Sequence, residues 1–271
     1  MSLAILATLC LGFVMTLSVF GTLKAQRDQR TAYDDYRFDL ANGTAPVSQT
    51  DENGVLLAPG TSVAILEIPK LGLQQVVAEG TTSGILMSGP GHRRDTVLPG
   101  QQGVSVVYGR RAAFGGPFRD LGDLRVGDEI KALTGQAESS YRVVAVRREG
   151  DVLPPAAQKG RLVLLTADGR PWLPDGVIAV DADLQTDAQP ADAKVVTAGS
   201  LAKAELPMQA DPASWVALLL WSQALLIAAV AVVFAWARWG RWEAWLLGIP
   251  VVLAVAIGAF SQAAQLLPNL L

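Results

Sequence analysis

Residues 161–184 read RLVLLTADGRPWLPDGVIAVDADL, and this segment is the clearest indication of the fold. It holds two short apolar runs, RLVLLT (161–166) and VIAVDADL (177–184), separated by a stretch with two prolines and two glycines. Runs of this length, rich in β-branched residues and bounded by Gly and Pro, are typical of β-strands. We therefore expect two strands joined by a loop over residues 169–176 (GRPWLPDG).

Five similar runs come earlier in the chain. They are VAILEIP (63–69), QQVVAE (74–79), VSVVYG (104–109), DEIKALT (128–134) and YRVVAVRR (141–148). In the last run, apolar residues occupy both alternating faces, which indicates a strand buried on both sides. Seven or eight short strands within residues 61–184, with almost no helical periodicity, predict a mainly β domain closed as a barrel.

Apolar segments lie on both sides of this domain. Residues 3–23 carry no charge and are long enough to cross a hydrocarbon core of about 30 Å. Because they lack a basic start and a small-residue cleavage site, residues 1–23 are expected to be an uncleaved anchor. Residues 213–271 hold two further apolar runs and predict a transmembrane helical hairpin. Residues 24–60 and 185–212 are polar and turn-rich, and predict a stalk and a linker.

The hairpin turn gathers aromatic and basic residues, as expected at a membrane interface. The expected interface residues are Trp236, Arg238, Trp239, Arg241 and Trp242. Basic residues also stand at the start of the domain, so the positive-inside rule by itself leaves the orientation nearly tied. Four polar residues at membrane depth indicate packing between the two helices or docking onto another membrane protein. They are Ser222, Gln223, Ser261 and Gln262, while Gly248, Pro250 and Gly258 are expected to interrupt the last helix.

The composition excludes several classes of function. Of 271 residues only 17% are charged, against about 25% in soluble domains, and the net charge of −3 gives no support for nucleic-acid binding. The single cysteine (Cys10) and single histidine (His92) exclude an intrachain disulfide and any zinc site built from Cys and His clusters. We expect no cofactor and no metal.

Several motifs between residues 65 and 135 occur together in a known order and spacing. They are ILEIPKLGL (65–73), GPGH-x3-T-x-LPGQ-x-G (89–103), a strand ending in Gly-x-Arg (109–111) and FGGPFRDLGDLRVGDEI (114–130). Together with LVLLT (162–166) and the strand at 177–184, they make residues 61–184 resemble the sortase family. The resemblance implies an eight-stranded barrel on the outer face of a Gram-positive-type cell envelope, with the N-terminus and the hairpin turn in the cytoplasm.

Members of that family cleave a sorting signal near the C-terminus of a secreted protein and join it to an amine, using a cysteine, a histidine and an arginine. By the resemblance, Arg110 stands at the histidine position, Ala167 at the cysteine position, and Val177, within one or two residues, at the arginine position. Alanine has no lone pair to attack a carbonyl, and arginine is no general base at neutral pH. Loss of such a nucleophile lowers turnover by about 10⁶.

The leading hypothesis is therefore a catalytically inactive, membrane-anchored sortase-like protein that acts by binding. It would be a scaffold or an accessory subunit of a cell-envelope membrane complex, such as a transporter, a secretion machine or an envelope-synthesis complex. An extracytoplasmic peptide is a second candidate partner. The candidate contact residues are Arg110, Arg111, Thr166, Asp168 and Trp172.

These residues lead to specific expectations. Arg110 either pairs with Asp168 or joins Arg111 in holding the carboxylate of a ligand. Trp172 is expected to be exposed, and either packs on its own loop or contacts a partner. His92 is expected to stabilise a turn or lie at the surface.

Two alternatives to the leading hypothesis stay open. One is an amidase or transferase of altered chemistry that uses Thr166 or Tyr108, although Thr166 should point to the opposite face of its strand from the nucleophile position. The other is a non-functional remnant of a duplicated sortase.

Overall fold

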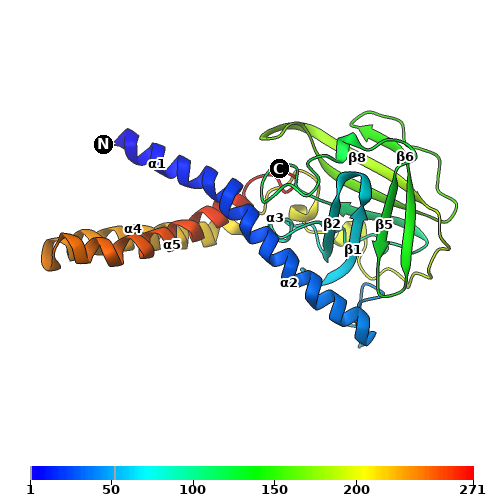
Figure 1. The fold of residues 1–271 in the computed structure, drawn as a ribbon, viewed down its shortest axis with the longest axis horizontal. Coiled ribbons are helices and arrows are strands. Elements are labelled where there is room, and N and C mark those ends of the chain that lie inside the picture. Colours follow the sequence, from blue (N-terminus) through cyan, green and yellow to red (C-terminus); the bar gives the residue numbers. More distant parts are fainter. Residues whose placement is uncertain (1, 52) are drawn as a thin grey trace.

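Eight strands close into a barrel in the part of the chain that the computed structural model describes, residues 2–51 and 53–271 (Figure 1). Around the barrel the strand order is β1-β2-β3-β4-β7-β8-β6-β5. The strands are β1 (Ser62–Ile68), β2 (Leu73–Glu79), β3 (Gly91–His92), β4 (Gly103–Tyr108), β5 (Glu129–Leu133), β6 (Glu138–Arg148), β7 (Gly160–Arg170) and β8 (Leu173–Leu184). The prediction of a mainly β, eight-stranded barrel is confirmed.

All seven apolar runs of the sequence form strands, with two corrections. Residues 169–176 are not a loop, because β7 and β8 continue through them and leave only a turn at Pro171 and Trp172. In β6, Arg142 is exposed between the buried Tyr141 and Val143, and the pairing with β8 shifts register before Ala145. The prediction that β6 is buried on both sides is therefore wrong.

The strands enclose an apolar core that we call the interior cluster. Alternate side chains of each long strand point inward, since side chains of a strand alternate between its two faces. In β7, Leu162 and Leu164 belong to this cluster and have no exposed surface, whereas the intervening Val163 does not belong to it. Members from the other strands include Val63, Val77, Val107, Ile130, Tyr141 and Val180.

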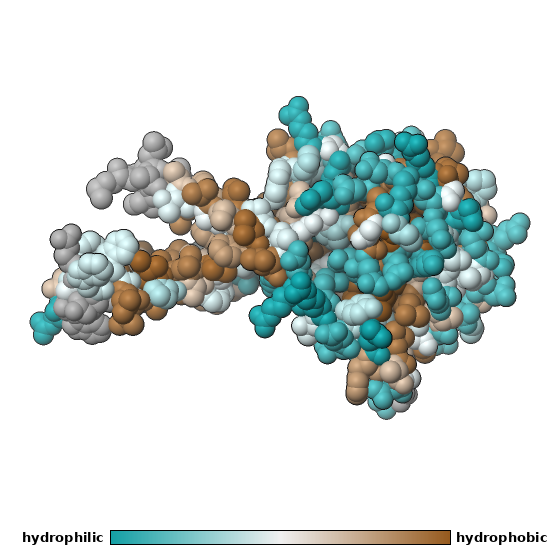
Figure 2. Space-filling view, viewed as in Figure 1, coloured by the Kyte–Doolittle hydropathy of each residue, from teal (hydrophilic) through white to brown (hydrophobic). Residues whose placement is uncertain are grey.

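Three helical segments are long and apolar enough to cross a membrane, as the sequence predicts: Ala7–Asn42, Ser214–Arg238 and Trp245–Gln265. The first combines α1 (Ser2–Met15), a π-helical turn (Thr16–Phe20) and α2 (Gly21–Asn42), and the others are α4 (Ser214–Trp239) and α5 (Arg241–Gln265). Figure 1 shows α1 and the α4–α5 hairpin leaving the barrel from one side, with the N-terminus and the hairpin turn far from it. In Figure 2 the visible surface of the hairpin is largely hydrophobic.

The hairpin packs through small residues, and α5 is continuous. A Cβ atom added at Gly248 would lie 2.7 Å from the Val232 side chain, and one at Gly258 would lie 2.5 Å from Trp221. These glycines therefore let α4 approach α5 closely, a common role of small residues between membrane helices. The prediction that they and Pro250 interrupt the last helix is wrong, because α5 includes all three.

Around the hairpin turn, Trp236, Arg238 and Trp242 have exposed side chains. The side chains of residues 2–6, 239, 241, 243 and 244 are not described, so the expected interface residues Trp239 and Arg241 lie outside the described side chains.

Much of the expected stalk is the helix α2, which packs on β1 and β2. The hydroxyl of the fully buried Tyr36 donates a hydrogen bond to the Val63 carbonyl oxygen, at 2.8 Å. The side-chain amide of Gln29 bonds both the N–H and the carbonyl of Val76. The remaining short helices are α3 (Ser83–Leu86) and the 3₁₀ turns Pro69–Leu71, Leu121–Asp123, Ala198–Ser200 and Lys203–Glu205.

Candidate functional site

The ends of β4, β7 and β8 meet at one place on the outer face of the barrel. β4 and β7 are parallel, with Tyr108 opposite Leu165, and β7 and β8 are antiparallel, with Ala167 opposite Val177. The outward side chains of these strands form a second apolar group, which we call the outer cluster. It consists of Leu86, Val106, Tyr108, Val163, Ala167, Ala179 and Leu270, with Leu165, Val177 and Met208 partly buried against it.

One member of the outer cluster comes from far along the chain. Residues 266–271, which we call the tail, follow α5 and lie against the barrel. Leu270 is fully buried among the outer-cluster side chains. The main-chain N–H groups of Arg111 and Ala113 donate to the carbonyl oxygens of Leu270 and Leu271, at 3.0 and 3.2 Å. The tail therefore covers the outer face where Ala167 lies.

Asn269 fixes the tail from the other side. Its side chain is fully buried, and Nδ2 donates to the carbonyl oxygens of Thr81 and Leu206, at 2.9 Å each. A typical hydrogen bond contributes about 1 kcal/mol net, and full burial of a leucine side chain contributes about 1.5–3 kcal/mol. Together these contacts hold the tail by several times thermal energy.

The tail, α5 and the N-terminal helix converge on the loop that follows β4. Leu17, Phe114 and Ala264 pack together in one buried cluster, with Leu267 against it. The Phe114 N–H donates to the Leu17 carbonyl at 3.1 Å, and Phe114 has a left-handed backbone (φ 54°). A positive φ is uncommon for a residue other than glycine, which marks this joint as tightly determined by its surroundings.

Arg110 is a buried cation that pairs with no carboxylate among the described residues. It has no exposed surface, and Nη2 donates to the Ser83 carbonyl (3.0 Å) and hydroxyl (2.7 Å). Its guanidinium carbon lies 5.2 Å from the centre of the Phe114 ring. Among the described residues, Nε and Nη1 have no hydrogen-bond partner. Burial lowers the pKa of Arg110 to about 9, so the group stays charged at neutral pH.

The expected pairing of Arg110 with Asp168 is wrong, because Asp168 binds two other arginines. Arg111 Nη1 lies 3.3 Å from Asp168 Oδ1, and Arg148 Nε lies 2.7 Å from Oδ2. Partial burial would raise the pKa of Asp168, but the Gly169 N–H and the two guanidinium groups outweigh it and hold that pKa below its usual value. Arg111 also donates to the Ala167 carbonyl, at 2.9 Å.

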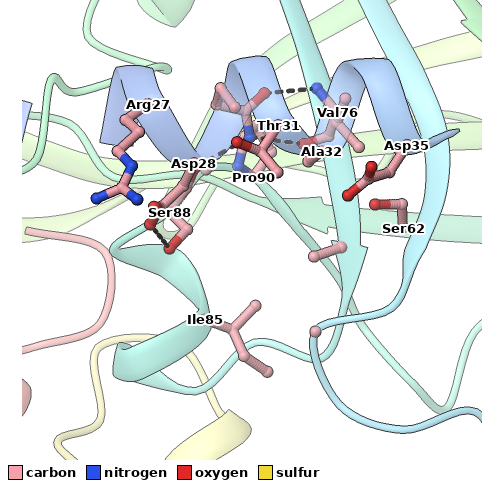
Figure 3. Close-up of a pocket in the computed structure, with 14 residues that line it drawn as sticks. Arg27, Asp28, Thr31, Ala32, Asp35, Ser62, Val76, Ile85, Ser88 and Pro90 are labelled. Carbon is pink, nitrogen blue, oxygen red and sulfur yellow. Dashed lines mark hydrogen bonds between the residues drawn. The ribbon is translucent and has the colours of Figure 1, made fainter. Parts of the chain in front are cut away.

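A polar cleft of about 520 Å³ lies nearby, between α2, β1, β2 and the loop after α3 (Figure 3). Asp28 and Asp35 of α2 line it, together with Ser62 and Ser88. The Ser88 hydroxyl already donates to Asp28, at 2.6 Å. Within the described residues, no group of three or more His, Cys, Asp or Glu side chains is placed to hold a metal ion.

Comparison with known proteins identifies the barrel. Residues 66–175 match the sequence model of the sortase domain. Sortase D of Bacillus subtilis (strain 168) is 30% identical over 132 residues, which cover 46% of this chain and 65% of that relative. The barrel is therefore similar to the sortase domain. The chain nevertheless spans slightly less than two thirds of the length of that relative.

Solved structures with similarity are also sortases. A Clostridium perfringens sortase D5 transpeptidase is 22% identical, with 59% of this chain and 99% of that chain covered and a TM-score of 0.49. Sortase E from Streptomyces avermitilis is 28% identical, with 55% of this chain and 100% of that chain covered and a TM-score of 0.42.

Of the three positions that the sequence assigns to the sortase catalytic groups, two pair directly and the third follows a neighbouring strand. Ala167 pairs directly with Val177, and Arg110 lies two residues beyond Tyr108 just as Ala167 lies two residues beyond its partner Leu165. The sortase match covers Arg110 and Ala167 and ends two residues before Val177. That these three residues replace the histidine, cysteine and arginine of the family stays a prediction.

The other candidate residues of the barrel differ in exposure. Thr166 is almost fully buried, and its hydroxyl donates to the Gly109 carbonyl at 2.8 Å. Tyr108 is fully buried in the outer cluster, and burial raises its pKa to about 12. Trp172 is 47% exposed at the β7–β8 turn, as predicted. These positions leave Trp172 as the accessible side chain of the three.

His92 is a buried structural residue, so the expectation of a surface position is wrong. Nδ1 lies 2.7 Å from Glu79 Oε2, and Nε2 lies 2.9 Å from the Val97 carbonyl oxygen. The ring therefore ties β2 to the segment after β3, which agrees with a role in stabilising a turn.

Sequence reasoning missed the residues that cover and line the outer cluster from other elements. These are Ser83 and Phe114, which contact Arg110, and the tail. The tail sequence LLPNLL (266–271) reads as the end of the last membrane helix. Only Pro268, which cannot continue a helix, could have indicated that the chain changes direction there.

Proposed function

We propose that this chain is a catalytically inactive, membrane-anchored sortase-like protein that acts by binding, as a scaffold or accessory subunit of a cell-envelope membrane complex. The observation that carries the proposal is the side chain at position 167. It is an alanine methyl group buried in the outer cluster, opposite Val177. Acyl transfer through a covalent intermediate needs an activated nucleophile and a base. Ala167 supplies no nucleophile, and Arg110, which is charged at neutral pH, supplies no base.

The contacts of Thr166 and Tyr108 favour inactivity over altered chemistry. The Thr166 hydroxyl is already hydrogen-bonded to the Gly109 carbonyl. Thr166 lies two residues after the interior-cluster residue Leu164, so its side chain is on the opposite face of β7 from that of Ala167, which belongs to the outer cluster. The raised pKa of Tyr108 keeps its hydroxyl protonated at neutral pH, which makes it a poor nucleophile.

The surface of α4 supports an accessory role in a membrane complex. Ser222 and Gln223 have exposed side chains, and Gln223 lies about 14 Å along the helix from Ser214. The packing of α4 on α5 uses Gly248 and Gly258 instead. Because an amide facing hydrocarbon is unfavourable, a neighbouring membrane protein that binds Gln223 would stabilise this surface.

The barrel would lie outside the cell, with the N-terminus and the hairpin turn in the cytoplasm. Departure of all the membrane helices from one side of the barrel supports this arrangement (Figure 1). An extracytoplasmic peptide is the second proposed partner. Two features support it: the unpaired nitrogens of Arg110, which suit a carboxylate, and the exposed Trp172.

The accessory role is tested by purifying the full chain from its native membrane in mild detergent and identifying proteins present in stoichiometric amount. We expect a membrane partner that is retained by Gln102→Leu, a matched change of an exposed barrel glutamine, and lost with Gln223→Leu. A chain that purifies alone, or a partner unaffected by Gln223→Leu, contradicts docking through this face. A variant without residues 213–271 shows whether the barrel alone holds a partner.

Inactivity is tested on the purified chain with sorting-signal peptides and an amine acceptor. We expect no product above a control without protein. Product from the unmodified chain contradicts the proposal. Loss of that product in Thr166→Val or Tyr108→Phe would then identify the nucleophile of an altered chemistry.

A further inference from the structure

We infer that the tail, residues 266–271, is an intramolecular ligand that closes the outer face of the barrel, and that this face takes another apolar segment only when the tail leaves. The inference rests on the proposed binding role of the chain and adds the occupant and the regulation of its site. Three features of the structure carry it.

The contacts of the tail are those of a bound peptide. Main-chain hydrogen bonds join it to Arg111 and Ala113, one side chain (Leu270) fills an apolar recess, and a polar side chain (Asn269) is held by carbonyl groups. The tail itself is folded as a turn, in which the Leu271 N–H donates to the Pro268 carbonyl at 3.1 Å. As in other bound peptides, the main-chain bonds supply affinity and the side-chain recesses supply specificity. The ligand chemistry is therefore an uncharged segment with a leucine preceded by an amide side chain.

The tail is also separable from the fold. The ladder of β4, β7 and β8 is complete without it, and in the described part of the chain no tail residue belongs to the interior cluster. Departure of the tail would leave the barrel closed while uncovering Leu86, Val163 and Ala167. An uncovered apolar patch of this kind is a binding surface for another segment.

The tail is directly connected to the membrane hairpin. Only Leu266 and Leu267 separate the end of α5 at Gln265 from the turn at Pro268. Ala264 and Leu267 pack against Phe114 of the loop that also holds the tail. A partner that displaces the hairpin would therefore pull on the tail, which links docking in the membrane to opening of the outer face.

A thiol at position 167 reports whether the face is open. The variant Ala167→Cys is made in a Cys10→Ser background, so that it carries one cysteine, and its labelling by a maleimide is followed in the full chain in detergent. With the tail in place we expect slow labelling, because modification requires the open form and its rate follows the population of that form. Adding Leu270→Asp should raise the rate at least about tenfold. Leu153→Asp, which changes an exposed leucine of another loop, should leave it unchanged.

A soluble peptide supplies the second measurement. A synthetic copy of residues 266–271 with added N-terminal lysines should slow the labelling of a chain lacking residues 268–271, and should not affect the unmodified chain. Unchanged circular dichroism of the barrel shows that each variant is folded. Asn269→Ala, which removes the hydrogen bonds of this side chain without adding a charge, should give an intermediate rate.

Equal labelling rates with and without Leu270→Asp, or no protection by the peptide, overturn the inference. These outcomes differ from a failure of the proposed function, which appears as turnover of a sorting-signal peptide or as the absence of a membrane partner.

Discussion

The two apolar clusters lie on opposite faces of the same strands but are closed in different ways. In β7, Leu164 points into the barrel and its neighbour Val163 points outward. The interior cluster is buried by the strands and the loops between them, whereas the outer cluster includes Leu270, about a hundred residues further along the chain. The interior therefore depends on the barrel alone, while the outer face also depends on where the membrane hairpin places the tail.

The largest effect expected from this difference is for truncation inside the barrel. Leu164 has no exposed surface and is surrounded by other interior-cluster side chains. Leu164→Ala should lower the free energy of unfolding by about 2–5 kcal/mol, because it removes buried methyl groups and leaves a cavity. Denaturant titration of the β-sheet circular dichroism in detergent measures this. A loss below about 1 kcal/mol would show that the barrel interior is not the main source of stability.

Gly109 is a point of close packing between the loop that carries Arg110 and the interior cluster. A Cβ atom there would lie 2.5 Å from the ring of Phe118, an interior-cluster residue, while the next residue is Arg110. Gly109→Ala should destabilise the chain by about 1–3 kcal/mol through overpacking. The matched control is Gly199→Ala, since nothing lies within 4 Å of a Cβ atom there. Equal stability of the two variants would contradict the tight packing at Gly109.

Truncation of Leu270 should act locally. Leu270→Ala should cost about 1–2 kcal/mol, less than Leu164→Ala, because the tail can detach while the barrel stays folded. The amide protons of Arg111 and Ala113, which are bonded to tail carbonyls, should then exchange at least about tenfold faster. Hydrogen exchange followed by mass spectrometry measures the exchange rates of these two amides. Faster exchange throughout β4 and β7 as well would mean that the tail supports the whole barrel.

The same difference explains what could be predicted from the sequence. Strands and membrane helices repeat a local pattern of apolar residues, so seven strands and three spans follow from the sequence. The two-residue strand β3 is too short to show a period. The packing of α2 on the barrel depends on Tyr36 and Gln29, which resemble any polar residues of a stalk.

At the candidate site, the resemblance points to Arg110, Ala167 and Val177, and the strand register pairs Ala167 with Val177. The partners of Arg110 could not be predicted, because Ser83 and Phe114 come from separate loops and carry no pattern that relates them to it. Asp168 is close in sequence to Ala167 and was the natural expectation, but Arg111 and Arg148 reach it instead.

Arg110 also gives the outer face a pH dependence. Its pKa is lowered to about 9 in the folded chain, from 12.5. Between these values the unfolded chain binds more protons, so the free energy of unfolding rises with pH. Between pH 8 and 10.5 the unmodified chain should gain about 2 kcal/mol relative to Arg110→Met. Chemical denaturation at a series of pH values measures the difference, and a constant difference would contradict a depressed pKa.

The smallest effect is expected at the rim of the outer face, where Asp168 is partly exposed between two arginines. Asp168→Asn should cost less than about 1 kcal/mol, because partly exposed ion pairs are screened by water. The lowered pKa of Asp168 means that its ionised form is favoured by folding, so its contribution is present above pH 4 and is lost as the pH falls through the folded value. The difference in unfolding free energy between the two chains should therefore vanish in acid. If it stays constant from pH 6 to pH 2, the side chain acts through its shape and not through its charge.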